Sequence, residues 1–196
     1  MAQLEILAFA GSLRRDSFNK KLLRVAATGA EENGAAVRIV DLADYPMPIF
    51  GEDLESREGI PEHARRFKAL MVSHPAFLIA SPEYNSSVSA ALKNAIDWAS
   101  RTESKDEPAL KAFRGKVAAL VSASPGQLGG LRGLVHLRAI LGNLMVHVVP
   151  EQYCLSKAHE AFDNEGTLVD ARAASAAKSV AAALARTTRA LNRTEG

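Results

Sequence analysis

Short apolar runs alternate with helical patterns along the whole chain, and this alternation constrains the fold more than any other feature. An apolar run of about four to eight residues between turn signals is typical of a buried strand, whereas apolar residues three and four apart indicate a helix with one buried face. Strands that alternate with helices favour βα units around a parallel sheet. The expected strands are Leu4–Ala10, Val37–Leu42, Phe77–Ser81, Val117–Ser122 and Leu144–Val149.

Helical patterns fill the segments that follow these runs. In the first helix, Leu22, Ala26 and Ala30 share one face, and Gly34 marks the end. Residues 45–61 form a long irregular connection that ends where Pro61 suits the first turn of a helix. Five strands and five helices in alternation predict a three-layer, doubly wound α/β fold, with residues 1–196 as a single domain. The expected helices are Asn19–Asn33, Pro61–Ser73, one through Ala91 to Ala99, Leu131–Leu141 and Val169–Leu191.

Composition narrows the class of protein. The formal net charge is only +2, and the basic residues are scattered, so no nucleic-acid partner is expected. The apolar runs are too short to span a membrane, and the chain begins directly with strand-like sequence, so neither a membrane location nor export is expected. Cys154 is the only cysteine, which fits a reducing cytoplasm and predicts a packed, uncatalytic thiol. The five histidines show no metal-ligand spacing, so no metal site is expected.

The segment between the first strand and the first helix is rich in hydrogen-bond donors. Residues 11–19, here called the phosphate loop, read Gly-Ser-Leu-Arg-Arg-Asp-Ser-Phe-Asn. A helix N-terminus offers unpaired backbone N–H groups and partial positive charge, and Ser12, Arg14, Ser17 and Asn19 add side-chain donors. One glycine among many donors suits a terminal phosphate better than the bridging pyrophosphate of a dinucleotide. The alternative, an ordinary βα loop with a helix cap, stays open on this segment alone.

Two further loops carry unusual residues. Residues 81–89, the ring loop, read Ser-Pro-Glu-Tyr-Asn-Ser-Ser-Val-Ser, and residues 124–130, the third loop, contain Gly126, Gly129 and Gly130. Tyr84 offers a flat face and Asn85 an amide, a mixture that suits a planar heteroaromatic ligand, while the glycines permit close backbone approach to its edge. Taken alone, the ring loop also fits an Asx-type turn with Tyr84 shielding the core. All three loops follow strands, and ligands of doubly wound sheets bind at the carboxyl ends of the strands.

The phosphate loop and the ring loop together resemble the NAD(P)H-dependent FMN reductase family, whose members include quinone, chromate and azo-dye reductases. The resemblance rests on Gly-Ser-Leu-Arg-x-x-Ser-x-Asn at residues 11–19 and on Ser-Pro-Glu-Tyr-Asn followed by Leu-Lys-Asn-Ala-Ile-Asp-Trp at residues 92–98. It implies a flavodoxin-like fold with a five-stranded parallel sheet in the order 2-1-3-4-5, and bound FMN. By the resemblance, the FMN phosphate contacts Ser12, Arg14, Ser17, Phe18 and Asn19, and the ring contacts Pro82, Glu83, Tyr84 and Asn85. The third loop adds Ser124 and Gly126. Ala123 has no hydroxyl, so only its backbone could contact the flavin.

The implied reaction passes a hydride from NADPH or NADH through bound FMN to quinones or other small acceptors in a ping-pong cycle. No catalytic side chain is expected, because the hydride chemistry belongs to the cofactor; Glu83 is assigned a role in turn geometry and not as a base. Arg14, Arg15 and Arg101 are candidates for the 2′-phosphate of NADPH. A homodimer or homotetramer is expected through elements near the flavin, with Trp98 either there or half-buried within one subunit. Two alternatives are a flavodoxin-type electron carrier without intrinsic NAD(P)H oxidation and a regulatory domain that binds no FMN.

Overall fold

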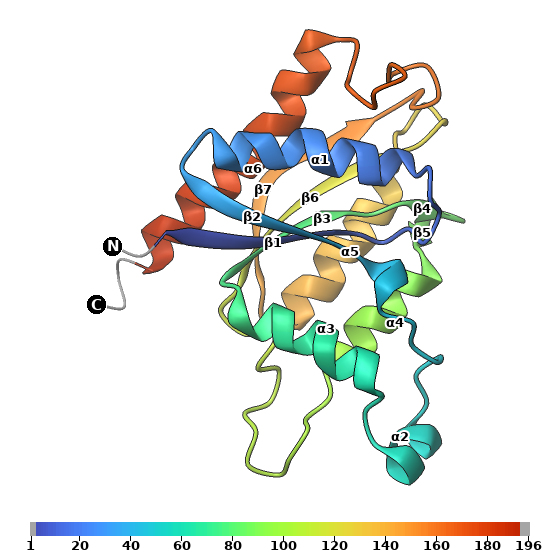
Figure 1. The fold of residues 1–196 in the computed structure, drawn as a ribbon, viewed down its shortest axis with the longest axis vertical. Helices are drawn as coiled ribbons and strands as arrows, with labels where there is room; N and C mark the ends of the chain where they lie inside the picture. The colour runs from blue at the N-terminus through green and yellow to red at the C-terminus, as the bar shows by residue number, and fades with distance from the viewer. Residues whose placement is uncertain (1–2, 193–196) are drawn as a thin grey trace.

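A five-stranded parallel sheet forms the centre of the computed structural model, which describes residues 3–192. Figure 1 shows the twisted sheet with β2 at one edge, β1 and β3 inside it, and β6 and β7 beyond. The order β2-β1-β3-β6-β7 confirms the predicted order 2-1-3-4-5, because the labels β4 and β5 belong to a separate small hairpin. The strands are β1 (Leu4–Ala10), β2 (Ala35–Asp41), β3 (Ala76–Ala80), β6 (Val117–Ala123) and β7 (His147–Leu155), and the hairpin consists of β4 (Glu83–Tyr84) and β5 (Ser87–Val88).

Helices cover both faces of the sheet and make the predicted three layers. In Figure 1, α1 and α6 lie on one face, and α3, α4 and α5 lie on the other. Two short helical segments, η1 and α2, interrupt the connection between β2 and α3. The helices are α1 (Phe18–Glu31), η1 (Leu42–Asp44), α2 (Glu52–Glu58), α3 (Glu62–Ser73), α4 (Ala90–Ala99), α5 (Leu131–Asn143) and α6 (Ala171–Asn192). Among the helices so described, none is long and apolar enough to cross a bilayer.

The central strands are buried on both faces, which explains why they read as continuous apolar runs. Every residue of β3 and of β6 is buried, and successive side chains point to opposite layers. Ile6 and Ala8 of β1 join the core beneath α1 and α6, while Leu7 and Phe9 join the core beneath α3, α4 and α5. Each buried large side chain stabilises the fold by about 1.5–3 kcal/mol relative to exposure, so the two cores fix the strand register.

The structure departs from the predicted elements mainly around proline and in the connections. The last strand was expected to end at Val149, but β7 runs from His147 to Leu155. Its pairing with β6 shifts between Ala118 and Leu120, and Pro150 lies within this irregularity, where its missing N–H does not interrupt a regular ladder. Residues 45–61 were expected to be irregular throughout, but they contain the helix α2.

Trp98 lies inside the subunit. Its side chain is fully buried, its indole N–H donates to the carbonyl of Pro48 at 2.8 Å, and the Phe50 ring packs against it edge-on. Trp98 therefore lies within one subunit, where it is fully buried and not half-buried as expected. The apolar pattern of α4 placed this residue on the buried face, where it joins the connection after β2 to the helix.

The helices α1 and α6 pack unusually closely, because small residues line both. Ala26 and Ala30 of α1 meet Ala177 and Ala181 of α6 in the core beneath them. At Gly29 the approach is closest: a Cβ there would overlap the backbone carbonyl group of Lys178. Gly29 is thus required by packing and not by backbone conformation.

We predict that Gly29→Ala lowers the free energy of unfolding by about 1–3 kcal/mol, because overpacking forces the two helices apart. This loss occurs although alanine is the better helix former by up to about 1 kcal/mol. Gly142→Ala in α5 is the matched control, since a Cβ there has no neighbour within 4 Å; it should leave stability unchanged or raise it. Urea unfolding of both variants measures the difference, and equal effects of the two substitutions would contradict the packing argument.

Candidate functional site

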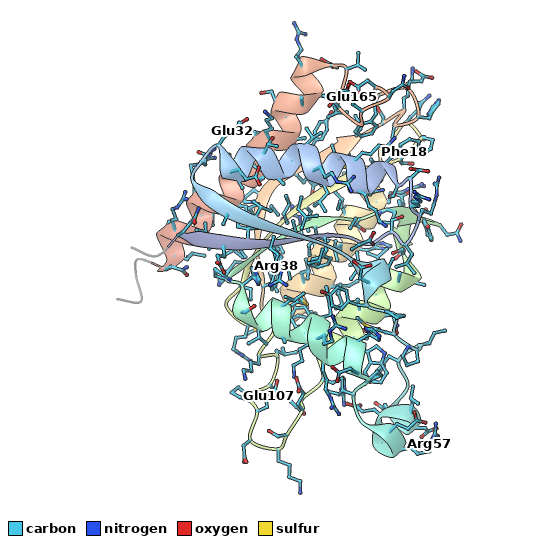
Figure 2. The ribbon with its side chains drawn as sticks, in the orientation of Figure 1. Phe18, Glu32, Arg38, Arg57, Glu107 and Glu165 are labelled. Carbon is cyan, nitrogen blue, oxygen red and sulfur yellow. The ribbon has the colours of Figure 1, made fainter. Side chains whose placement is uncertain are left out.

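The phosphate loop, the ring loop and the third loop meet at one edge of the sheet. They follow β1, β3 and β6, which are neighbouring parallel strands, so their carboxyl ends lie side by side. Phe18, labelled in Figure 2, marks this edge at the start of α1, and the β4–β5 hairpin lies beside it in Figure 1. This is the position at which doubly wound sheets bind their ligands.

A small cleft opens between the three loops. It brings together nine of the eleven residues that the sequence assigned to the cofactor; Asn85 and Gly126 are not part of its lining. Ala123 and Pro125 line it in addition, and their position at the end of β6 and just after it is the signal that the sequence offered for them. The lining consists of Ser12, Arg14, Ser17, Phe18, Asn19, Pro82, Glu83, Tyr84, Ala123, Ser124 and Pro125.

The phosphate loop presents hydrogen-bond donors that the protein itself leaves free. Ser17 is the N-cap of α1 in extended conformation, yet its side chain makes no capping hydrogen bond. The first N–H groups of α1 therefore face the cleft without a side-chain acceptor. Ser12 and Ser17 are 3% and 4% exposed, and the Arg14 guanidinium forms no ion pair with any residue between 3 and 192. These groups suit an anion.

Gly11 and Ser89 fix the phosphate loop to the ring loop. The Gly11 N–H donates to the carbonyl of Ala80 at 2.9 Å, and its carbonyl accepts a hydrogen bond from the buried Ser89 hydroxyl. Ser89 is also the N-cap of α4, where its oxygen accepts from the Leu92 N–H at 3.2 Å. A Cβ at Gly11 would lie 2.8 Å from the Leu92 Cβ, so only glycine lets α4 pack this closely.

Asn19 connects the start of α1 to the end of β6. Its amide nitrogen donates to the carbonyl of Ala123 at 2.9 Å, and its amide oxygen accepts from the Ala123 N–H at 3.0 Å. Asn19 therefore lines the cleft, as expected, while its amide is engaged by the protein. The backbone of Ala123, which the sequence left as a possible contact to the flavin, is engaged by the same pair of hydrogen bonds.

The ring loop folds as a tight hairpin. Glu83 and Tyr84 pair with Ser87 and Val88, and the two residues of the turn, Asn85 and Ser86, have φ of 48° and 66°. Positive φ at both central positions is typical of the hairpin turn that matches strand twist, and asparagine tolerates it well. Tyr84 is 51% exposed. The alternative of an Asx-type turn with Tyr84 shielding the core is therefore wrong.

Glu83 holds the hairpin against the N-terminus of α5. Its carboxylate accepts from the Arg132 Nε at 2.9 Å and from the Gly133 N–H at 3.0 Å. Partial burial alone raises the pKa of the Glu83 carboxyl, but the hydrogen bonds and charge of Arg132 and the Gly133 N–H outweigh it, so the pKa lies below its ordinary value. Glu83 is thus ionised and bonded, which agrees with the expected role in turn geometry.

The third loop uses its glycines to approach the protein's own strands. Gly129 and Gly130 have φ of 59° and 93°. A Cβ at Gly130 would overlap the Ser122 hydroxyl, and one at Gly129 would lie 2.8 Å from the carbonyl carbon of Cys154. The expectation that these two glycines permit close approach to a ligand is therefore wrong. Gly126 lies outside the cleft lining, and its N–H bonds to the Ser124 hydroxyl at 3.2 Å.

The other side chains singled out in the sequence lie elsewhere. Arg101 is bound to Glu55, with its Nε 2.8 Å from one carboxylate oxygen, and is not free for a nucleotide phosphate. Cys154 is partly buried, and burial, followed by the charge of Glu83, raises the pKa of its thiol to about 11. Within residues 3–192, no cluster of three or more His, Cys, Asp or Glu side chains is arranged to hold a metal ion.

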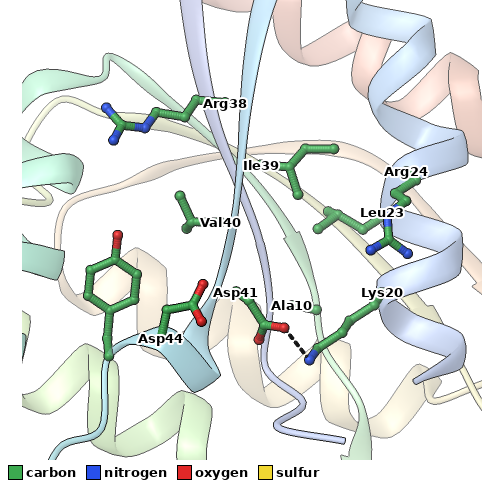
Figure 3. Close-up of a pocket in the computed structure, with 10 residues that line it drawn as sticks. Ala10, Lys20, Leu23, Arg24, Arg38, Ile39, Val40, Asp41 and Asp44 are labelled. Atoms are coloured by element: carbon green, nitrogen blue, oxygen red, sulfur yellow. Dashed lines mark hydrogen bonds and ion pairs between the residues drawn. The ribbon is translucent and has the colours of Figure 1, made fainter. Parts of the chain in front are cut away.

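A second hollow lies beside the edge strand β2 (Figure 3). Its charged groups are partly paired: the Lys20 ammonium contacts the Asp41 carboxylate, as the dashed line shows. Arg24 and Arg38 flank β2 on opposite sides in this view. None of the residues of the phosphate loop, the ring loop or the third loop lines this hollow. The cleft between the loops is therefore the candidate functional site.

Residues 4–160 match the model of a protein family described as NADPH-dependent FMN reductase. The chain belongs to this family. It is thus an NAD(P)H-dependent oxidoreductase that uses FMN, and the resemblance drawn from its loops is confirmed.

Individual relatives span most of the chain. A probable NADPH:quinone oxidoreductase 2 of Oryza sativa subsp. japonica is 38% identical over 172 residues, which cover 85% of this chain and 80% of the relative. An NAD(P)H-dependent FMN reductase of Pseudomonas aeruginosa is 37% identical and covers 87% of each chain. Among solved structures, the flavoenzyme FerB of Paracoccus denitrificans, an NAD(P)H:(acceptor) oxidoreductase, superimposes with a TM-score of 0.80 at 27% identity, over 95% of this chain and 98% of that one.

The ionised state of Glu83 predicts a pH dependence of stability. A carboxyl whose pKa is lowered by folding stabilises the native state above its unfolded pKa of about 4.3 and loses this contribution as the pH falls through the folded pKa. Wild type should therefore lose more free energy of unfolding between pH 5 and pH 3 than Glu83→Gln, measured by urea unfolding. Glu58→Gln, which removes an exposed pair with Arg57, should follow the wild-type curve. If Glu83→Gln also follows it, the hairpin is held by other contacts.

Proposed function

We propose that the cleft between the three loops binds FMN and that the chain uses it to pass hydride from NADPH or NADH to quinones and other small acceptors. One observation carries the proposal: an uncapped helix N-terminus, two buried hydroxyls and a free guanidinium converge beside an exposed aromatic hairpin. The residues proposed to bind FMN are Ser12, Arg14, Ser17, Phe18, Asn19 (through its backbone N–H), Pro82, Glu83, Tyr84, Asn85, Ser124 and Gly126.

The phosphate of FMN is proposed to bind at the start of α1. Backbone N–H groups of the first turn and the helix dipole favour a dianion there, and the hydroxyls of Ser12 and Ser17 donate to its oxygens. Arg14 adds a charge-assisted contact from the exposed side of the loop. Since Ser12 and Ser17 are buried and the loop is held through Gly11, these donors are already in place before binding.

The ring of FMN is proposed to lie along the ring loop and the third loop. When bound, FMN supplies the chemistry of accepting and releasing a hydride. Pro82 and Tyr84 offer apolar surface, and backbone N–H groups at this edge stabilise negative charge on the ring. Glu83 is not proposed as a base, because its carboxylate is bound to Arg132 and Gly133. The half-exposed Tyr84 fits a site whose outer side stays open to nicotinamide and acceptor in turn.

Quinones are the acceptor class that the names of the relatives favour. The rice relative is named a probable NADPH:quinone oxidoreductase, and a Pseudomonas putida relative, 36% identical over 162 residues, is named a quinone reductase. Either nicotinamide fits the proposal, and Arg15, exposed in the phosphate loop, is a candidate for the 2′-phosphate of NADPH. A flavodoxin-type carrier without NAD(P)H oxidation receives no support from these comparisons.

A homodimer or homotetramer is proposed as the working assembly. Support comes from large apolar side chains that are exposed to solvent. Leu13 in the phosphate loop is 55% exposed, and Ile49 in the connection between β2 and α3 is 87% exposed. We also propose that residues 1–196 act as one domain, of which 1–2 and 193–196 lie outside the described residues. A cytoplasmic location is proposed on the single cysteine.

Arg14→Ala is expected to weaken FMN binding about 10- to 150-fold, which corresponds to about 1.5–3 kcal/mol for a hydrogen bond to a charged group. Quenching of flavin fluorescence on titration of the apoprotein measures the dissociation constant. Arg15→Ala is the matched control, because it removes the same charge from the neighbouring residue, which does not line the cleft. Equal affinities of wild type and Arg14→Ala would place the phosphate elsewhere.

Steady-state oxidation of NADPH by the FMN-loaded protein with benzoquinone separates an enzyme from a carrier. We expect turnover without any added reductase, and parallel lines in double-reciprocal plots at several benzoquinone concentrations, since both substrates use the same open face. Turnover that appears only after a separate reductase is added would support the carrier.

A further inference from the structure

We propose that the Asn19 side chain is a positioning residue that sets the distance between the phosphate loop and the third loop, and that it is not a ligand of the phosphate. The inference rests on the proposed binding of FMN in the cleft and concerns how one residue prepares that site.

The contact is a closed pair of hydrogen bonds. The Asn19 amide donates to the Ala123 carbonyl at 2.9 Å and accepts from the Ala123 N–H at 3.0 Å, so both ends of the amide bind one residue 104 positions away. Because the backbone N–H only donates and the carbonyl only accepts, the orientation of the amide is fixed. The side chain thus satisfies both the N–H and the carbonyl of the last residue of β6, as the backbone of a neighbouring strand would.

Burial makes this pair costly to break. Asn19 is 4% exposed and Ala123 is 4% exposed, so an amide turned toward a ligand would leave a buried N–H and carbonyl of Ala123 without partners. A buried backbone group without a hydrogen-bond partner is strongly unfavourable. The phosphate, by contrast, has other donors at hand: the Ser12 and Ser17 hydroxyls and the N–H groups of α1. Asn19 therefore remains on Ala123 when the cleft is filled.

Ala123 leads directly into the third loop, whose start is also fixed on its other side. The Ser124 N–H donates to the Leu155 carbonyl at 3.0 Å, and the Ser124 carbonyl accepts from the Ala158 N–H at 3.1 Å. Ser124 and Pro125 line the cleft opposite the phosphate loop. Loss of the Asn19 amide releases the strand end on the α1 side only, so Ser124 and Pro125 shift relative to the helix that receives the phosphate.

This geometry predicts how affinity depends on the two parts of the ligand. A residue that binds the phosphate contributes to the affinity for FMN but not to the affinity for riboflavin, which lacks the phosphate. A residue that positions the third loop contributes to both, because the ring contacts of the two molecules are the same. The ratio of the two affinities therefore distinguishes the roles.

We expect Asn19→Ala to lower the affinities for FMN and for riboflavin by a similar factor, about 5- to 50-fold for two lost hydrogen bonds. Arg14→Ala should lower the affinity for FMN alone. Asn33→Ala is the matched control: it removes an amide that bonds the Gly29 carbonyl at 2.8 Å at the far end of α1, and it should change neither affinity. Fluorescence titration measures both flavins, and bound FMN should show a shifted absorption maximum in Asn19→Ala but not in Arg14→Ala.

Selective loss of FMN affinity in Asn19→Ala would overturn the inference and make Asn19 a phosphate ligand, while the proposed function would stand. Failure of wild type to bind either flavin would instead overturn the proposed function. If Asn19→Ala does not fold, Asn19→Asp serves in its place, because it keeps the shape and the acceptor but loses the donor to Ala123. Its riboflavin affinity must then fall at least about 5-fold, and an unchanged value contradicts the positioning role.

Discussion

The parallel register of β1, β3 and β6 is the constraint on which the site depends. Because these strands are neighbours and run in one direction, the segments that follow them emerge at the same edge, although they are separated by many residues in the sequence. The register itself is held by burial on both faces, since a slip of one residue would exchange the side chains of the two cores. The apolar cores thus determine where the polar loops meet.

Buried polar side chains then fix the loops to one another. Ser89 joins the phosphate loop to α4, Asn19 joins it to β6, and Glu83 joins the ring loop to α5. Each satisfies backbone groups that no strand or helix pairs, at places where the chain leaves regular structure. A site held in this way loses little conformational freedom on binding, so more of the interaction energy appears as affinity.

The sequence predicts the parallel sheet, the order of its strands and most of the residues that line the cleft, for physical reasons that can be stated. Periodicity identifies strands and helices, and the loops of a parallel sheet share one edge. The predictions from the sequence failed where a residue's role depends on contacts with residues far away in the chain. The strand predicted to end at Val149 continues through Pro150 to Leu155, because its pairing with β6 is irregular there. Gly129 and Gly130 suggested room for a ligand, but Ser122 and Cys154 fill that room. The partner of Asn19 depends on contacts across 104 positions, which no local pattern encodes.

The environment of Cys154 has a chemical consequence for an oxidoreductase that is proposed to use quinones as acceptors. Quinones alkylate thiolates, and only the deprotonated sulfur is a strong nucleophile. Because burial raises the pKa of the Cys154 thiol to about 11, this side chain stays protonated at neutral pH. Since the chain has no other cysteine, it carries no other thiol that could be alkylated. Cys154 is thereby protected from arylation by electrophiles.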